Sequence, residues 1–246
     1  MATALPDRLK RLTNPERVLA AFGRRWFEWH MDRVPIEPYE RLVVLGDEWG
    51  GGWAVPDDLI DDSWICYCVG AGSDVSFDLA LIERYGARVR CVDPFSVFGE
   101  QAEAAAGGDP RFSFYEAALA PTDGPLTMFG AEDPESGSLS AANLYGTERV
   151  LTKPGKTLPT LMAEVGDQRV DLLKLDIEGS EYEVLPELDL AALGVRVLCV
   201  ELHASRSVAE AKQLLERIRS QGFRLIHCQH PASFTFVGST APAARI

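Results

Sequence analysis

Residues 64–94 read WICYCVGAGSDVSFDLALIERYGARVRCVDP, and this stretch decides the fold class. The apolar run 64–69 predicts a buried strand that ends at a glycine turn. The spacing of the apolar residues that follow predicts a helix over 78–85, and residues 88–92 predict a second strand that ends at Asp93. A strand, a helix and a strand in this order form the βαβ unit of a parallel sheet.

The same alternation continues toward the C-terminus. We expect strands at 112–118, 170–175 and 195–200, helices at 182–193 and 208–221, and a closing pair of strands at 223–227 and 234–237. The pattern predicts one doubly wound, Rossmann-like α/β domain. Residues 121–145 are rich in Gly, Pro, Ser and acidic residues, so a long loop or lid is expected there, with a β-hairpin arm at 126–129.

The N-terminal part predicts an amphipathic helical cap. After Asn14-Pro15, apolar residues recur at helical spacing, namely Val18, Leu19, Phe22, Trp26 and Trp29. Two interpretations of the tryptophans are open: an aromatic platform for a sugar, or a face packed on the domain, which we favour. We expect the helical cap at 1–45, the catalytic domain at 46–240 and a tail at 241–246.

Composition excludes several classes of protein. The chain has 246 residues and a net charge of −13, which argues against binding to nucleic acid or to an anionic membrane surface. The five cysteines contain no CxxC pair, so reduced thiols and a cytoplasmic location are expected. We see no apolar run of the length of a signal peptide or a membrane span.

The glycine turn and the strand-end acid predict a nucleoside-containing cofactor. Asp93 follows Gly72 by 21 residues, the spacing at which a carboxylate accepts hydrogen bonds from a ribose diol. Val75 stands where a dinucleotide fingerprint has its third glycine, and Asp74 would repel a pyrophosphate. These residues favour S-adenosylmethionine, which has a cationic sulfur and no phosphate. The candidate cofactor residues of this region are Gly70, Ala71, Gly72, Asp93 and Pro94.

Several segments together resemble a known family. Residues 170–181, VDLLKLDIEGSE, closely resemble the signature of the FkbM-type methyltransferases, and 67–78, YCVGAGSDVSFD, resemble the cofactor motif of a related subgroup. Gly51-Gly52-Trp53, Thr157-Leu158 and Glu201-Leu202-His203 match further elements. The resemblance implies a class I methyltransferase with strand order 3-2-1-4-5-7-6, which transfers methyl groups from S-adenosylmethionine, commonly to a hydroxyl.

One position departs from many class I enzymes, which have an acid two residues before the first glycine where this chain has Cys68. We expect the amino-acid end of the cofactor to be held instead by Asp74, Ser76 and the loop Gly51-Gly52-Trp53. Ser76 has a second interpretation of equal weight, as the N-cap of the helix that follows.

Acidic residues and a histidine end two neighbouring strands of the expected sheet. Asp176 and Glu178 follow the fourth strand, and Glu201 and His203 follow the fifth. Two mechanisms fit: His203 or Asp176 acts as a general base, or Asp176, Glu201 and His203 hold Mg²⁺ or Mn²⁺, which acidifies the acceptor hydroxyl. Lys174 points the same way as Asp176 and would keep it ionised. We interpret Glu181 mostly as a helix-terminal acid.

The acceptor is predicted from the residues around the site. Aromatic residues beside carboxylates suit a neutral, polyhydroxylated small molecule, and the aromatic candidates are Trp26, Trp29, Trp49 and Trp53. We therefore expect O-methylation of a carbohydrate or of a sugar-bearing or polyketide-like natural product. Two alternatives stay open, a nicotinamide-dependent oxidoreductase and a non-catalytic cofactor-binding protein. A homodimer is one option for the assembly, which the sequence does not determine.

Overall fold

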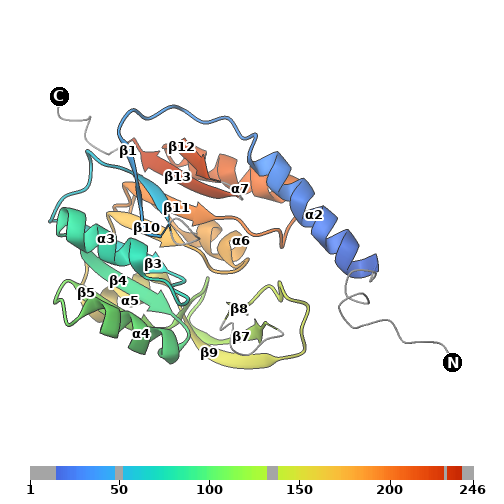
Figure 1. The fold of residues 1–246 in the computed structure, drawn as a ribbon, viewed down its shortest axis with the longest axis horizontal. Helices are drawn as coiled ribbons and strands as arrows, with labels where there is room; N and C mark the ends of the chain where they lie inside the picture. The colour runs from blue at the N-terminus through green and yellow to red at the C-terminus, as the bar shows by residue number, and fades with distance from the viewer. Residues whose placement is uncertain (1–14, 48–51, 132–137, 230–231, 240–246) are drawn as a thin grey trace.

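The computed structural model describes residues 15–47, 52–131, 138–229 and 232–239, with side chains from residue 21 onward (Figure 1). Its centre is a seven-stranded sheet with the order β12-β13-β11-β10-β3-β4-β5. The strands are β3 (Ile65–Val69), β4 (Arg88–Asp93), β5 (Phe112–Glu116), β10 (Leu172–Leu175), β11 (Val197–Glu201), β12 (Phe223–Gln229) and β13 (Ser233–Gly238). Numbered along the chain this is the expected order 3-2-1-4-5-7-6, and β13 is antiparallel to both its neighbours.

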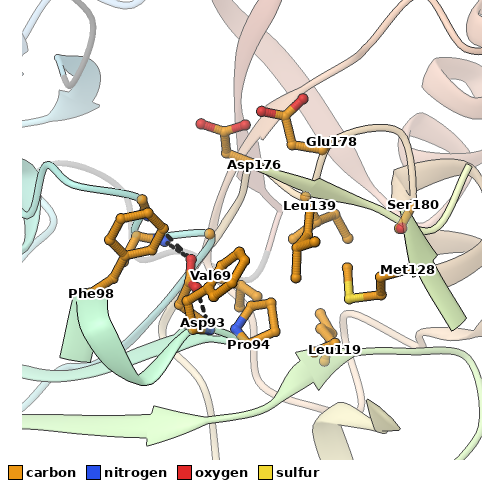
Figure 2. Close-up of a pocket in the computed structure, with 16 residues that line it drawn as sticks. Val69, Asp93, Pro94, Phe98, Leu119, Met128, Leu139, Asp176, Glu178 and Ser180 are labelled. Carbon is orange, nitrogen blue, oxygen red and sulfur yellow. Dashed lines mark hydrogen bonds between the residues drawn. The ribbon is translucent and has the colours of Figure 1, made fainter. Parts of the chain in front are cut away.

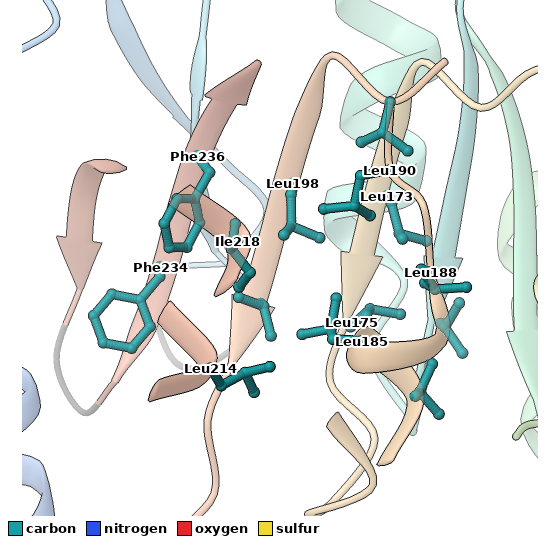
Figure 3. Close-up of a cluster of buried hydrophobic side chains, with 14 of the residues drawn as sticks. Leu173, Leu175, Leu185, Leu188, Leu190, Leu198, Leu214, Ile218, Phe234 and Phe236 are labelled. Atoms are coloured by element: carbon teal, nitrogen blue, oxygen red, sulfur yellow. The ribbon is translucent and has the colours of Figure 1, made fainter. Parts of the chain in front are cut away.

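Helices cover both faces of this sheet. They are α2 (Pro15–Met31), α3 (Ser76–Tyr85), α4 (Ser96–Ala106), α5 (Leu158–Val165), α6 (Glu181–Val184), the 3-10 turn η2 (Leu185–Glu187) and α7 (Val208–Ser220). Because side chains alternate along a strand, Tyr67 of β3 joins the core beneath α5, α6 and α7, whereas Cys66 and Cys68 join the core beneath α3. Figure 3 shows the first of these cores.

Three local expectations are wrong. The helix expected at 182–193 is a single turn, α6, followed by η2, because Pro186 cannot continue an α-helix. Residues 42–45 form strand β1 (Leu42–Leu45), which pairs with β2 (Trp53–Pro56), so the segment 1–45 is not wholly helical. The outer face of α2 is also not packed, since Phe22, Trp26 and Trp29 are 70%, 54% and 47% exposed.

A different stripe of α2 contacts the domain. Phe27 and Met31 lie one helical turn apart and are buried in the core beneath α7. On the exposed side, Trp26 stacks on Trp29 with ring centres 5.8 Å apart, and the Arg33 guanidinium lies 3.9 Å from the Trp29 ring. The packed face of this helix is therefore the narrower of its two apolar stripes.

The region expected to be a loop or lid forms a second sheet. Strand β7 (Gly124–Gly130), which contains the expected hairpin arm, pairs along its length with β9 (Val150–Lys156). The short strands β6 (Ala118–Leu119) and β8 (Leu139–Ser140) complete the order β6-β9-β7-β8. This inserted sheet lies beside the carboxyl ends of the central strands (Figure 1), where ligands bind in open α/β sheets.

Candidate active site

The glycine turn after β3 lies directly against the end of β10. Gly70 has φ +84°, and a Cβ built on it would lie 1.7 Å from the Asp176 carbonyl oxygen. Only glycine combines that backbone conformation with that clearance. The turn therefore brings the N–H groups of Ala71 and Gly72 close to the acids that follow β10.

Asp93 fixes this turn from the neighbouring strand. One carboxylate oxygen accepts hydrogen bonds from Ala71 N and Gly72 N, each 3.1 Å long, and the other accepts one from Phe95 N at 2.9 Å (Figure 2). Burial raises the pKa of Asp93, and the three N–H donors oppose that shift. A carboxylate has about four acceptor positions, so one remains for a ligand hydroxyl.

A cavity opens above this turn. Its polar wall contains the glycine turn, Asp93, Asp176 and Glu178, and its apolar wall contains Pro94, Phe95, Phe98, Leu119, Met128 and Leu139. Figure 2 shows Leu119, Met128 and Leu139, which belong to the inserted sheet, on one side of the cavity. The apolar wall suits the base of a nucleoside, and the carboxylate suits the hydroxyls of its ribose.

Among the other expected cofactor residues that the structure describes, Gly52, Trp53, Asp74 and Ser76 do not line this cavity. Ser76 is not the N-cap of α3; that position is Val75, without a side-chain hydrogen bond. Instead the Ser76 hydroxyl accepts a hydrogen bond from Asp47 N at 2.8 Å, and Asp74 accepts one from Ser76 N. Trp53 is buried in the core beneath α3, near Gly52. Gly51 and Trp49 lie outside the described residues.

Lys174 connects the glycine turn with Asp176. Its Nζ donates to the Gly70 carbonyl oxygen at 2.6 Å and lies 3.7 Å from Asp176 Oδ2. Burial alone would lower the pKa of Lys174, but Asp176 and Asp78 outweigh it and the pKa is raised. Lys174 therefore stays charged beside Asp176.

His203 lies among four carboxylates. Its Nδ1 is 3.0 Å from Glu181 Oε1, and its Nε2 is 3.4 Å from Glu178. Asp176 and Glu201 lie 3.8 Å and 3.9 Å from the same Nε2. Burial would lower the pKa of His203, but Glu181 and the other carboxylates raise it to about 10. The imidazole is therefore protonated near neutral pH, which does not suit the general-base role expected of it.

Glu181 is the residue whose place in the site the sequence did not reveal. It is fully buried, and the oxygen that contacts His203 also accepts a hydrogen bond from Ile177 N at 2.9 Å. It orients the imidazole so that Nε2 faces Glu178. The interpretation of Glu181 as a helix-terminal acid is therefore incomplete.

Burial also affects the other acids of the cluster. It raises the pKa of Glu201 to about 7, with a further contribution from Asp176, and it raises the pKa of Glu178. Carboxyl groups of this kind take up a proton more readily than exposed ones.

The expected Mg²⁺ or Mn²⁺ site at Asp176, Glu201 and His203 is not supported. Across the described residues, no three His, Cys, Asp or Glu side chains form a group that could hold a metal ion. One nitrogen of His203 is engaged by Glu181 at 3.0 Å, and the other lies 3.4 Å from Glu178.

A second cavity lies between α2 and these strand ends. The helix contributes Gly23, Arg24, Phe27 and Glu28, the segment after β8 contributes Leu144 and Tyr145, and the strand ends contribute Glu178, Glu201, Leu202, His203 and Ala204. Trp26 and Trp29 do not line it. Glu178 lines this cavity and the first one, so the two cavities meet at this residue.

The sheet order, the glycine turn and the strand-end Asp93 together define a class I methyltransferase fold. The sequence profile described as the methyltransferase FkbM domain matches residues 66–225, and the chain belongs to this family of S-adenosylmethionine-dependent methyltransferases. The oxidoreductase alternative finds no support in this assignment. Among the described residues, no helix combines the length and apolar character needed to cross a membrane.

Individual relatives are distant. The antimetabolite synthetase AmbE of Pseudomonas aeruginosa is 38% identical over 74 residues, which is 28% of this chain and 4% of that protein. A solved Corynebacterium glutamicum protein has a TM-score of 0.44 at 14% identity, over 97% of this chain and 99% of its own. The precorrin-6y C5,15-methyltransferase of Geobacter metallireducens has a TM-score of 0.43 at 11% identity, over 74% of this chain and 84% of its own. Identities this low carry no information on the acceptor.

Proposed function

We propose that this methyltransferase transfers the methyl group to a hydroxyl of a carbohydrate or of a sugar-bearing or polyketide-like natural product. The observation that carries the proposal is the meeting of two cavities at Glu178, one suited to a nucleoside and one open to a second molecule. The second cavity has both an aromatic residue, Phe27, and carboxylates in its wall, which suits a neutral acceptor with several hydroxyls.

In this proposal the first cavity holds S-adenosylmethionine. Asp93 accepts a hydrogen bond from the ribose, and the turn from Gly70 to Gly72 lies close to the cofactor backbone, beside Pro94. When bound, S-adenosylmethionine supplies a methyl group attached to a cationic sulfur. After transfer of the methyl group, this sulfur is a neutral thioether. Contacts of the cofactor with Asp74, Ser76 and the segment 51–53 stay a prediction, since the described ones lie outside the cavity wall.

The chain's own residues handle the proton of the acceptor hydroxyl. Glu178 is placed to accept it as the new oxygen–methyl bond forms, because its carboxylate lies where the cavities meet and burial raises its pKa. The protonated His203, held by Glu181, keeps the Glu178 carboxylate in position at 3.4 Å. The Lys174 ammonium lies beside them, 3.7 Å from Asp176 Oδ2.

The experiment uses the purified chain, labelled S-adenosylmethionine and a panel of glycosides and hydroxylated natural products, with amines, carboxylic acids and proteins as comparison acceptors. We expect label in an ether that resists mild base. Label only in amines, esters or proteins would refute the acceptor class. Dialysis against EDTA should leave the rate unchanged, and a rate that is lost and then restored by Mg²⁺ or Mn²⁺ would restore the metal mechanism.

A further inference from the structure

The backbone at Glu178 has a conformation that needs external support. Glu178 has φ +53°, in the left-handed region that side chains with a Cβ seldom occupy. Gly179 follows with φ +97°, and a Cβ there would lie 3.0 Å from Ser205 Oγ and 3.1 Å from Ala142 Cβ. Strained positions of this kind persist when the surrounding structure holds them, and they gather at functional sites.

The support comes from Ser140 of the inserted sheet. Ser140 is fully buried at the end of β8, and its hydroxyl donates a 2.5 Å hydrogen bond to the Glu178 carbonyl oxygen. The same hydroxyl accepts a 3.2 Å hydrogen bond from Leu144 N. One side chain thus joins the loop after β10 to the segment after β8.

That segment takes part in both cavities. Leu139, the neighbour of Ser140, lines the cofactor cavity, and Leu144 and Tyr145 line the acceptor cavity. Ser140 lies between them in the chain and is bonded to the carbonyl of the residue at which the cavities meet. The hydroxyl is therefore placed to fix the Glu178 carboxylate relative to both ligands.

We propose that Ser140 is a positioning residue for methyl transfer, which holds Glu178 in its left-handed conformation and makes the inserted sheet part of the catalytic machinery. The inference rests on the proposed role of Glu178. Misplacement of a reacting group by about 1 Å can lower a rate about 100-fold, so a hydrogen bond that sets this position affects turnover more than ligand binding.

The test compares Ser140→Ala with Ser140→Thr, which keeps the hydroxyl, and with Ser220→Ala as a control for the loss of a serine hydroxyl away from the site. Ser220 makes the same kind of bond, from its hydroxyl to the Arg217 carbonyl oxygen at 2.7 Å, at the end of α7. For Ser140→Ala we expect kcat to fall about 10- to 100-fold while acceptor KM and the Kd of S-adenosylhomocysteine change less than about threefold. Ser140→Thr should recover kcat at least in part.

A wild-type kcat in Ser140→Ala, or a Ser140→Thr variant as slow as Ser140→Ala, would overturn the proposal. Amide hydrogen exchange gives a second readout that needs no acceptor. In Ser140→Ala, exchange should accelerate at Leu144 and across residues 176–184 but not in α7. If the wild-type chain methylates no hydroxyl, the proposed function fails, and unchanged exchange at 176–184 would separately refute the positioning role.

Discussion

Glu181→Gln should lower the free energy of unfolding in the wild type and raise it in a His203→Ala background. Glu181 is fully buried, and its ion-pair partner among the described residues is His203, at 3.0 Å. Removing one member of a buried pair leaves an uncompensated charge and costs about 3–5 kcal/mol of unfolding free energy. We expect His203→Ala to lose stability in that range.

Glu181→Gln then has opposite signs in two backgrounds. In the wild type it removes a charged hydrogen bond and should destabilise the fold by about 1.5–3 kcal/mol. In His203→Ala it removes the stranded charge, so it should restore about 1–3 kcal/mol. The effects of Glu181→Gln in the two backgrounds then differ by about 2.5 kcal/mol or more, which means that the two substitutions are strongly coupled. The assay is urea unfolding of the four proteins at pH 7. Additivity of the two substitutions within about 0.5 kcal/mol would refute the ion pair.

The pH dependence of the same cycle gives an independent check. The pKa of His203 is raised from 6.5 to about 10 in the folded state, so its contribution to stability is fully present below pH 6.5. That contribution is lost as the pH rises from 6.5 to about 10. The stability gap between wild type and His203→Ala should therefore narrow over this window. A gap that is constant from pH 6 to pH 10 would show that His203 does not carry this charge.

Three further predictions concern the cofactor turn and Asp176. Asp93→Ala leaves Ala71 N and Gly72 N without their acceptor, and it should weaken S-adenosylhomocysteine binding at least about 10-fold in calorimetry; unchanged affinity would remove Asp93 from the site. Gly70→Ala forces a Cβ to 1.7 Å from the Asp176 carbonyl oxygen and should prevent folding. A Cβ at Gly72 has nothing within 4 Å, so Gly72→Ala should lower the free energy of unfolding by only about 1–2 kcal/mol. Equal thermal stability of the two variants would contradict the packing at Gly70. Asp176→Ala removes a carboxylate that lies 3.8 Å from His203 Nε2, beside the proposed base Glu178; by disturbing that position it should lower kcat about 10- to 100-fold, and undiminished turnover would exclude Asp176 from the site of methyl transfer.

The central sheet could be predicted because each of its strands has a local signal. The run that ends at Gly70 is apolar throughout, and Asp93 marks the end of the next strand. The inserted sheet gave a weaker signal. Its main pairing joins Leu126 to Lys153, and β9 contains Pro154 and Gly155, residues typical of turns. Pairing between segments this far apart depends on the whole chain, so the sequence indicated a loop.

The acids at the strand ends could be predicted, but their roles could not. Glu181 follows Gly179-Ser180 and is the first residue of a short helix, which is the local pattern of a helix-terminal acid. Its burial comes from the docking of His203, 22 residues further on. The packed face of α2 was ambiguous for a similar reason, since Trp26 and Phe27 lie on different faces of the helix and tertiary contacts select which face is buried.

The two cavities differ in how far the family accounts for them. The glycine turn, Asp93 and the acids after β10 all lie within the matched residues 66–225. One wall of the acceptor cavity is built by Gly23, Arg24, Phe27 and Glu28 of α2, which precede that region by about forty residues. The family profile describes only the residues that it matches, and the proposed base Glu178 lies among them. The residues of α2 lie outside it and are free to differ between members of the family. We therefore expect substitutions on this face of α2 to change which acceptor is methylated. The same substitutions should leave the affinity for the cofactor unchanged.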